Sequence, residues 1–584
     1  MNLLKISCFV ASLALLALLP AKSHSQGFLK AKDQQIVNET GKPVILRGIG
    51  LGGWMLQEGY MLRINSNGQQ HKIRERIKDL IGEKQTQEFY DTWLANHTTK
   101  RDIDSLKAWG FNSVRLPMHY NLYTLPIEKE PVRGQQTWLE KGFALTDSLL
   151  SWCKANNMYL ILDLHATPGG QGNDLNISDR DTSKPSLWDS EANQQKTIAL
   201  WKRLASRYAN EPGIAGYDLI NEPNWGFEDK NDRNGQKEQK NAPLRKLLME
   251  ITAAIRSVDK KHIIIIEGNA WGNNYNGMLP TWDDNMVLSY HKYWNNNDES
   301  SIRHILETRS KYNVPVWLGE TGENSNVWFT EAIRLLESHQ IGWAWWPLKK
   351  LGANNPLQIR SNPNYDDLVA YWSGQSKHKP KESNAYSGLL ELAAYTNIRS
   401  NIVHRDVIDA MIRQPFNPTA VPFKNHRLTK GYTLKAVDYD LGPNGVAYFD
   451  TDTADYHISN GQRSGGNRGR TYRNDGVDIR KEESRYESYY ITDTEAGEWL
   501  QYTVDVPANA AYTIELLTGG QKPGKVTLST GNTELAKEIA IPAAKGPEDW
   551  QTVTLENMQL KKGKQTIRIL IGTGGFTLKE IRFK

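Results

Sequence analysis

Short apolar runs alternate with amphipathic stretches from residue 44 to residue 348, and this repeat constrains the fold more than any other feature. The apolar runs are Val44–Leu51, Ser113–Met118, Tyr159–His165, Gly216–Glu222, His262–Gly268, Met286–Tyr293, Val314–Thr321 and Gly342–Leu348. Between them, segments such as Asn193–Tyr208 and Leu244–Val258 carry apolar residues at helical spacing. Eight strands that alternate with helices predict an α/β domain, a closed (β/α)₈ TIM barrel.

Charged and aromatic residues gather at the carboxyl ends of these predicted strands. They are Asp163 and His165 on the third strand, Asn221 and Glu222 on the fourth, His291 and Tyr293 on the sixth, Glu320 on the seventh, and Trp345 and Trp346 on the eighth. The carboxyl ends of TIM-barrel strands form the face on which active sites are built. We therefore expect one functional site at this face.

Two glutamates of this set suit the hydrolysis of a glycosidic bond. That reaction needs one carboxylic acid to protonate the leaving oxygen and one carboxylate to attack the anomeric carbon. Barrel closure brings the fourth and seventh strands to face each other, so the two carboxyl groups can meet. Our hypothesis makes Glu222 the general acid/base and Glu320 the nucleophile, with Arg115 and Tyr293 placed to keep Glu320 ionised.

The neighbouring polar residues are assigned to substrate binding. Asn221 is placed to hydrogen-bond the 2-hydroxyl of the sugar, a contact that strengthens in the transition state. We expect His165 and His291 to orient the substrate and the acid/base. Taken singly, Arg115 also fits a barrel salt bridge and Trp346 plain packing, and only the joint placement at strand ends favours catalysis.

A metal site is the main competing interpretation of Asp163, His165, His291 and Glu320. No HExxH or His-x-His spacing supports it, so we predict no metal and no other cofactor. A formal charge of +5 without a long basic run gives no reason to expect nucleic acid as a partner. The 19 Trp and 25 Tyr residues instead supply flat apolar faces with polar edges, which suit sugars.

Residues 1–25 have the layout of a secretory signal peptide. Lys5 supplies the positive start, an apolar run follows to Leu19, and small residues surround a cleavage position near Ser23. The run is shorter than the ~20 residues that span a bilayer, so we expect export, extracellular or periplasmic, and no membrane span. Cys8 and Cys153 leave the mature chain without an internal disulfide, and nothing requires more than a monomer.

The character of the sequence changes after residue 415. Three prolines, Pro415, Pro418 and Pro422, punctuate a polar stretch. We therefore place a catalytic domain at 28–415, a linker at 416–431 and a second domain at 432–584. Its predicted strands include Trp499–Val506, Tyr512–Leu517, Lys525–Ser529, Thr552–Leu555 and Thr566–Ile571. Short strands without a long helical pattern predict an all-β jelly-roll sandwich.

Over roughly residues 28–415 the sequence resembles glycoside hydrolase family 5. The matching segments are RGIGLGGW (47–54), FNSVRLP (111–117), DLH (163–165), INEP (220–223), YHKY (290–293), LGET (318–321) and WWPL (345–348). The resemblance implies a retaining mechanism with acid/base Glu222 and nucleophile Glu320. It also implies a supporting set made of Arg115, His165, Asn221, His291, Tyr293 and Trp346.

Within that family, LGGWMLQEGYM (51–61) and DLHATPGGQG (163–172) resemble the exo-β-1,3-glucanase branch. This likeness implies that Glu58 hydrogen-bonds the nonreducing sugar in a deep pocket. Related endoglucanases and glycoceramide-cleaving enzymes share much of the same pattern, so exo and endo action both stay open.

The C-terminal region resembles carbohydrate-binding module family 6 through YRNDGVDI (472–479) and AGEWLQYTVDVP (496–507). In that family an aromatic pair sandwiches a sugar, and Tyr489 with Trp550 are the counterparts that the resemblance implies. The family often carries acidic residues for a structural calcium, whereas GGFTLKEI (574–581) and TLKAVDY (433–439) lack several of them. This departure counts against calcium and weakens the inference of sugar binding. The alternative is a domain that only packs against the barrel.

The sequence therefore predicts a secreted retaining β-glycosidase that hydrolyses β-glucan, as an exo-β-1,3-glucanase or an endo-β-glucanase. The appended module would raise the local concentration of enzyme at a polysaccharide surface. The alternatives are a non-catalytic carbohydrate-binding protein, a transglycosylase that uses the same intermediate, and a glycosidase of mannan or glycolipid. A silent binding protein would be expected to lack one of the two glutamates, and both are present.

Overall fold

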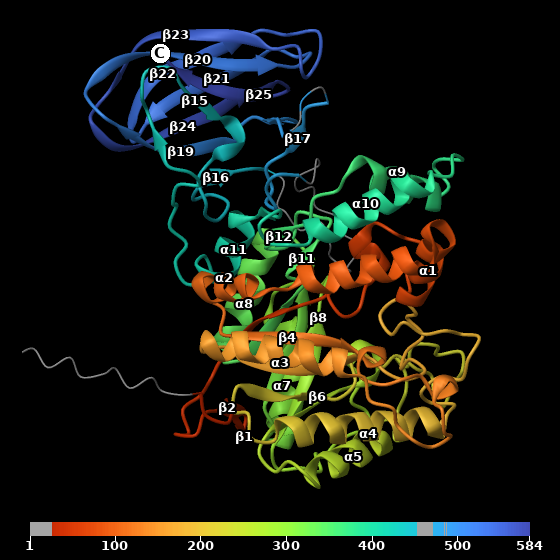
Figure 1. The fold of residues 1–584 in the computed structure, drawn as a ribbon. Helices are drawn as coiled ribbons and strands as arrows, with labels where there is room; N and C mark the ends of the chain where they lie inside the picture. Colours follow the sequence, from red (N-terminus) through yellow and green to blue (C-terminus); the bar gives the residue numbers. More distant parts are fainter. Residues whose placement is uncertain (1–25, 452–470, 484, 486) are drawn as a thin grey trace, which may run out of the picture.

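The computed structural model describes residues 26–451, 471–483, 485 and 487–584, so the predicted signal peptide lies outside the described residues. Figure 1 shows an α/β body that contains the N-terminal and central residues, and a stack of β-sheets in blue at one end of it. Among the described residues, we find no helix with both the length and the apolar character to cross a membrane.

Eight parallel strands close into a barrel. They are β3 (Arg47–Gly50), β4 (Ser113–His119), β5 (Tyr159–Ala166), β6 (Ile214–Asp218), β7 (Ile263–Glu267), β8 (Met286–Lys292), β9 (Val316–Gly322) and β10 (Gly342–Trp346). Each strand pairs with the next along the chain, and β10 pairs with β3 to complete the circle. The predicted TIM barrel is confirmed.

The strands are buried along almost their whole length because both faces of a barrel sheet are covered. Every residue of β4, β6, β7, β8, β9 and β10 is buried. Side chains from the strands fill the interior, so the barrel is a packed core rather than a pore. Polar residues inside it therefore need partners, and those partners lie at the carboxyl end.

The fourth barrel strand is shorter than the sequence predicts. β6 ends at Asp218, whereas the predicted run continues to Glu222. Glu222 has a φ of 41°, in the left-handed region, which an extended strand cannot contain. Its backbone N–H donates to Glu267 Oε2 at 2.7 Å instead of joining a strand ladder. Asn221 and Glu222 thus lie in a turn beyond the strand.

Helices lie around the strands (Figure 1). They are α1 (Gln70–His97), α2 (Lys100–Trp109), α3 (Glu140–Ala155), α4 (Glu191–Tyr208), α5 (Ala242–Arg256), α6 (Asn269–Gly272), α7 (Glu299–Tyr312), α8 (Asn326–Ser338), α9 (Pro363–Trp372), α10 (Glu382–Tyr395) and α11 (Arg405–Ile412). Shorter elements are β1 (Lys30–Lys32), β2 (Gln35–Val37), η1 (Gly59–Leu62), η2 (Tyr120–Leu122), η3 (Ile127–Lys129), β11 (Lys349–Lys350), β12 (Leu357–Gln358) and β13 (Ile402–Val403). α1 is interrupted at Gly82, whose φ of 75° is not helical.

The C-terminal region folds into two β-sheets. One contains β14 (His426–Arg427), β16 (Tyr448–Phe449), β19 (Trp499–Val506), β21 (Gly524–Thr530), β22 (Thr533–Ile541) and β24 (Gly563–Thr573). The other contains β15 (Tyr432–Lys435), β17 (Ile479–Lys481), β18 (Tyr489–Ile491), β20 (Ala510–Gly519), β23 (Gln551–Leu560) and β25 (Thr577–Phe583), and η4 (Ala436–Asp438) follows β15. Residues of both sheets, such as Tyr502 and Ile514, share one core.

This arrangement confirms the predicted all-β domain. β14 lies inside 416–431, the segment predicted as a linker, and pairs with β19. The boundaries assigned from the sequence stay a prediction.

The sandwich meets the barrel through a buried loop around Asn474. The Asn474 backbone N–H donates to Asp406 Oδ2 at 2.8 Å, and its side chain donates to the Asn324 carbonyl at 2.8 Å. The Asn474 carbonyl accepts from the Asn326 backbone N–H at 2.8 Å. Asn324 and Asn326 follow β9, the strand that carries Glu320. The two domains are therefore joined next to the candidate site.

Candidate active site

Arg115 is the centre of the polar network inside the barrel mouth. It lies on β4 and is fully buried. Its Nε and Nη2 donate to Asp218 Oδ2 at 3.0 and 2.8 Å, and Nη2 also donates to Glu267 Oε1 at 2.9 Å. Nη1 donates to Glu320 Oε1 and lies 3.2 Å from Asp163 Oδ2. Although burial opposes the charge, these carboxylates raise the pKa of Arg115 well above its ordinary value.

Glu320 is held from two sides. It lies on β9, and its side chain is only 6% exposed. Arg115 donates to one carboxylate oxygen, and the Tyr293 hydroxyl donates to the other, Oε2, at 3.1 Å. Charged and hydroxyl donors both stabilise the ionised form of a carboxylic acid. The predicted neighbours of Glu320 are thus brought together as the sequence led us to expect.

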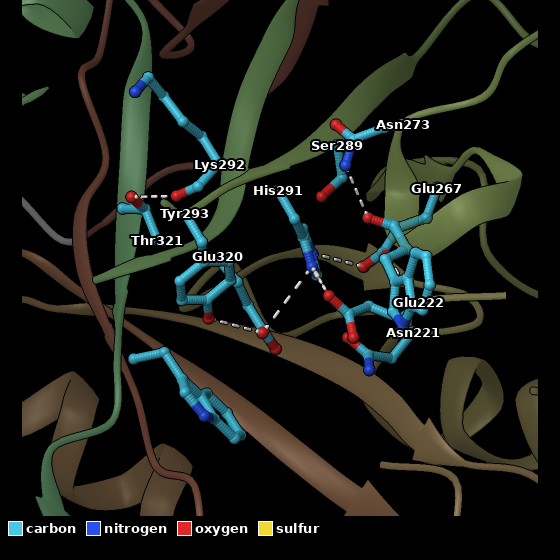
Figure 2. Close-up of polar contacts among 12 residues, drawn as sticks. Asn221, Glu222, Glu267, Asn273, Ser289, His291, Lys292, Tyr293, Glu320 and Thr321 are labelled. Carbon is cyan, nitrogen blue, oxygen red and sulfur yellow. Dashed lines mark hydrogen bonds and ion pairs between the residues drawn. The ribbon is translucent and has the colours of Figure 1, made fainter. Parts of the chain in front are cut away.

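Glu222 occupies a different environment. Figure 2 shows Glu222 and Glu320 reaching toward His291 from opposite sides. His291 Nδ1 lies 2.6 Å from Glu222 Oε1 and 3.7 Å from Glu320 Oε2. Burial, despite the opposing effect of His291, raises the pKa of Glu222 to about 7. Glu222 can therefore hold a proton near neutral pH, as a general acid must.

His291 links three carboxyl groups. Burial disfavours its charged form, but the nearby carboxylates, Glu267 first, raise the pKa of His291 well above its ordinary value. Its Nε2 lies 3.2 Å from Glu267 Oε1. Charged His291 donates a hydrogen bond from Nδ1 to Glu222 Oε1, and this bond holds the Glu222 carboxyl group in place.

Glu267 and Asp218 belong to this network, although neither is among the site residues predicted from the sequence. Glu267 accepts from Arg115 and from the backbone N–H of Glu222, so it fixes the turn that carries Glu222. The signal for Glu267 was available, because it is the last residue but one of the predicted run His262–Gly268 and so lies at the carboxyl end of that strand. Asp218 ends β6, but the predicted strand ran past it and placed it in the middle.

His165 and Asn221 form the next layer. His165 Nδ1 contacts Asp163 Oδ2 at 2.7 Å, and its Nε2 contacts Asn221 Nδ2 at 3.2 Å. Because an amide nitrogen can only donate, His165 Nε2 accepts and Nδ1 carries the proton. Burial lowers the pKa of His165 to about 3, which agrees with a neutral ring. The Asn221 oxygen accepts from Arg115 Nη2 at 2.9 Å.

Trp346 and Glu58 line the same region. Trp346 stacks on His165 with centroids 5.1 Å apart and donates its indole N–H to the Tyr60 hydroxyl at 2.9 Å. A Cβ at Gly50 or Gly52 would lie 2.6 Å from the Trp346 ring, so the glycines of RGIGLGGW leave room for it. Glu58 Oε1 lies 3.9 Å from His165 Nε2. Burial and the charge of Glu320 raise the pKa of Glu58 well above its ordinary value.

The distance between the two glutamates decides what the site can do. One polar atom each from Glu222, His291 and Glu320 lie within 4.8 Å of one another. Carboxyl groups about 5–5.5 Å apart allow a glutamate to attack the sugar directly, whereas about 6.5–9.5 Å leaves room for a water. The same three residues are a cluster that could hold a metal ion by position, but the Arg115 guanidinium on Glu320 already supplies a positive charge there.

The predicted aromatic pair of the sandwich does not come together. Tyr489 contacts Tyr472 at 4.8 Å and packs against the sandwich core. Trp550 contacts Tyr490 at 5.3 Å and donates its indole N–H to Glu482. Tyr489 and Tyr490 are neighbours on β18, so their side chains point to opposite faces of the sheet. Because Trp550 contacts Tyr490, it lies on the face opposite to Tyr489. A sugar cannot be clamped between them, which corrects this expectation.

Comparison with known families agrees with both resemblances read from the sequence. Residues 73–352 match the model of cellulase, glycosyl hydrolase family 5. Residues 469–584 match the model of carbohydrate binding module family 6.

Curated relatives match the barrel part of the chain. A beta-xylosidase of Phanerodontia chrysosporium is 30% identical over 268 residues, which cover 46% of this chain and 52% of the relative. Endoglucanase C of Acetivibrio thermocellus is 25% identical over 52% of this chain and 91% of its own length. A probable glucan 1,3-beta-glucosidase A of Aspergillus niger is 28% identical over 31% of this chain and 42% of its own length. The chain thus spans about half of the first of these relatives.

Proposed function

Since the barrel of this chain is a glycosyl hydrolase family 5 domain and its C-terminal region a family 6 carbohydrate binding module, we propose that it hydrolyses β-glucan with retention of configuration through a covalent glycosyl-enzyme intermediate. The chain is a glycoside hydrolase. The linkage, the exo or endo mode and the export of the enzyme belong to the proposal.

One observation carries the retaining mechanism. The carboxyl groups of Glu222 and Glu320 approach within 4.8 Å, which is short for a water-mediated inverting reaction. Glu320 would attack the anomeric carbon and displace the leaving sugar, whose oxygen takes the proton of Glu222. In the second step Glu222 removes a proton from water while the water oxygen bonds to the anomeric carbon, and the bond to Glu320 breaks and releases the sugar.

The surroundings of each glutamate support this division of roles. Arg115 and Tyr293 each donate a hydrogen bond to the Glu320 carboxylate, and buried Glu222 holds its proton near neutral pH. Arg115 also orders Asn221, which is placed for the 2-hydroxyl. The sugar face would pack on Trp346, and a protonated Glu58 would donate to a hydroxyl at the nonreducing end.

Glucan is the substrate class that the relatives favour. The printed names of two of them, endoglucanase C and glucan 1,3-beta-glucosidase A, describe glucan-cleaving enzymes of both modes. The segments around Glu58 and His165 favour the exo-β-1,3 mode. Export through residues 1–25 would bring a monomeric enzyme to a polysaccharide outside the cell.

Product analysis tests the proposal. The mature chain is incubated with β-1,3-, β-1,4-, mixed-linkage and β-1,6-glucans, with β-mannan and a glycosylceramide included, and Glu320→Gln serves as the control. Glucose alone from laminarin would establish the exo-β-1,3 mode, and a ladder of oligosaccharides would establish endo action. Cleavage of only mannan or glycolipid would overturn the glucan assignment, and full activity of Glu320→Gln would overturn the mechanism.

A further inference from the structure

The motif YHKY (290–293) contains one charged residue that has no part in the proposed mechanism. Lys292 lies between His291 and Tyr293, is the last residue of β8, and is only 3% exposed. Neighbouring residues on a strand point to opposite faces. Figure 2 shows the Lys292 side chain extending away from Glu320. A lysine that is buried and does not reach the two glutamates must therefore serve something else.

The loop that follows β8 holds the Lys292 ammonium. Nζ donates to Asn295 Oδ1 at 2.5 Å, to the Asn296 carbonyl at 2.9 Å and to Asn297 Oδ1 at 2.8 Å. It also lies 4.7 Å from the centre of the Trp328 ring on α8. Burial lowers the pKa of Lys292 to about 7, so this position is unfavourable for a charge unless its donors are met. An ammonium has three N–H donors, and the loop accepts all of them.

The loop begins at Tyr293, and its conformation fixes that residue. The Asn295 backbone N–H donates to the Tyr293 carbonyl at 2.5 Å, so the chain folds back directly after the strand. The Asn295 carbonyl accepts from the Trp328 indole N–H at 2.8 Å, and Asn297 Nδ2 donates to the Trp328 carbonyl at 3.1 Å. Asn295 is thus held by Lys292, Tyr293 and Trp328 together.

The Lys292 backbone joins the same loop to the neighbouring strand. Its carbonyl accepts from the Thr321 hydroxyl at 2.6 Å, a bond drawn in Figure 2. Thr321 directly follows Glu320 on β9. From the far side of this bond, the Tyr293 hydroxyl reaches Glu320 Oε2 at 3.1 Å. Lys292 therefore fixes both the turn that carries Tyr293 and the spacing between that turn and the strand of Glu320.

We propose that Lys292 is a positioning residue, which acts through the loop at 295–297 to hold the Tyr293 hydroxyl against the Glu320 carboxylate. The proposal rests on the proposed function, because it takes Glu320 as the nucleophile. The hydroxyl orients the carboxylate for attack and stabilises it again when the sugar leaves. Since the loop uses all three N–H donors of Lys292, its effect on the reaction passes through Tyr293.

A double-mutant cycle tests the proposal. Lys292→Met keeps the length of the side chain and removes its donors, and Tyr293→Phe removes only the hydroxyl. We expect each single substitution to lower kcat/KM on an aryl β-glucoside by about tenfold, because each weakens a hydrogen bond to a charged group. In the Tyr293→Phe background, Lys292→Met should add less than about twofold, because the contact is already gone. Losses that multiply to about a hundredfold would overturn the proposal.

Lys196→Met is the matched control. Lys196 is 1% exposed, and its Nζ also donates to three oxygens of one segment, those of Thr124, Glu130 and Gln136. That segment lies between β4 and α3 and contains neither Tyr293 nor a catalytic glutamate. Lys196→Met should lower the melting temperature and leave kcat/KM within about twofold. A tenfold loss of kcat/KM in this control would reduce the effect of Lys292→Met to general destabilisation and would contradict a positioning role.

Asn295→Ala keeps the test decisive if Lys292→Met does not fold. It removes one acceptor of the ammonium from a half-buried loop position and should lower kcat/KM by about threefold, again with no further loss beside Tyr293→Phe. The alkaline limb of the pH–rate profile, which follows the Glu222 proton near pH 7, should keep its position. A displaced limb would mean that the loop acts through His291 and Glu222, and would overturn the role assigned to Tyr293.

The two proposals fail in different ways. Full activity of Glu320→Gln would overturn the proposed function. Multiplied losses in the cycle of Lys292 and Tyr293, with Glu320→Gln inactive, would overturn the positioning role alone.

Discussion

The barrel mouth and the sandwich each bury a charged arginine, and their surroundings differ. Arg115 contacts carboxylates from several barrel strands, among them the predicted nucleophile. Arg473 instead pairs with Asp475 and covers the Tyr439 ring at 3.9 Å, and both of these partners belong to the sandwich. Both side chains are about 1% exposed or less. The comparison teaches that burial of charge alone does not mark a catalytic site, whereas convergence of several strands on one charge does.

The same contrast separates the binding residues of the two domains. In the barrel, residues far apart in sequence meet around His291 and Arg115. In the sandwich, Tyr489 and Trp550 lie on opposite sides of one sheet, and Asn474 is used to dock the domain on the barrel. The sandwich therefore contributes residues that attach it to the barrel, in addition to any surface that binds sugar.

The largest expected effect concerns the acid. Glu222→Gln should reduce kcat/KM on polymer by about 10³-fold, within the range for loss of a general acid. Since the pKa of Glu222 is raised to about 7, the wild-type rate should fall as pH rises through that value and the proton is lost. A pH–rate profile checks both statements. If the alkaline limb persists in the variant, another group is the acid.

Substituting each of the two buried arginines tests directly whether the barrel mouth and the sandwich differ in function. Arg115→Lys removes the forked contacts to Glu320 and Glu267 and should lower kcat/KM by about 10²-fold. Arg473→Lys should lower the melting temperature but leave kcat/KM on an aryl glucoside within about twofold. Kinetics and thermal unfolding of both variants provide the measurement. A comparable loss of activity in the two would erase the distinction between the regions.

The docking loop should give a smaller effect. Asn474→Ala removes the side-chain bond to the Asn324 carbonyl, close to the strand of Glu320. Because one lost hydrogen bond between buried groups costs about 1 kcal/mol, the melting temperature should fall by a few degrees and kcat/KM by about threefold. Asn444→Ala, which loses contacts confined to the sandwich, is the control. Equal activity of both variants would mean that docking does not reach the site.

At the sandwich surface, the expected effect is on adsorption to the polymer and not on catalysis. Trp550→Ala should weaken adsorption to insoluble glucan by about threefold and spare turnover of small substrates. Tyr489→Ala should instead destabilise the domain, because that ring packs against the core. Adsorption isotherms and melting curves distinguish the two outcomes. Unchanged adsorption of Trp550→Ala would favour a purely structural module.

Most of the barrel and its two glutamates could be predicted because the strands have a regular apolar pattern and their polar ends are conspicuous. Glu267 was missed although it ends a strand, and Asp218 was missed because the predicted fourth strand ran too far. The turn at Glu222 depends on a hydrogen bond to Glu267, a contact between distant residues that no local pattern contains. The prediction that Tyr489 and Trp550 form a pair failed for the same reason, since the side of the sheet to which a ring points depends on strand register.

Trapping the covalent intermediate tests the central claim most directly. The protein is incubated with an activated 2-deoxy-2-fluoro-β-glucoside, digested, and its peptides are weighed by mass spectrometry. The account predicts one added glycosyl group, on the peptide that contains Glu320. It also predicts that the first sugar released by hydrolysis has the β configuration. A label on Glu222, or an α product without a label, would contradict it.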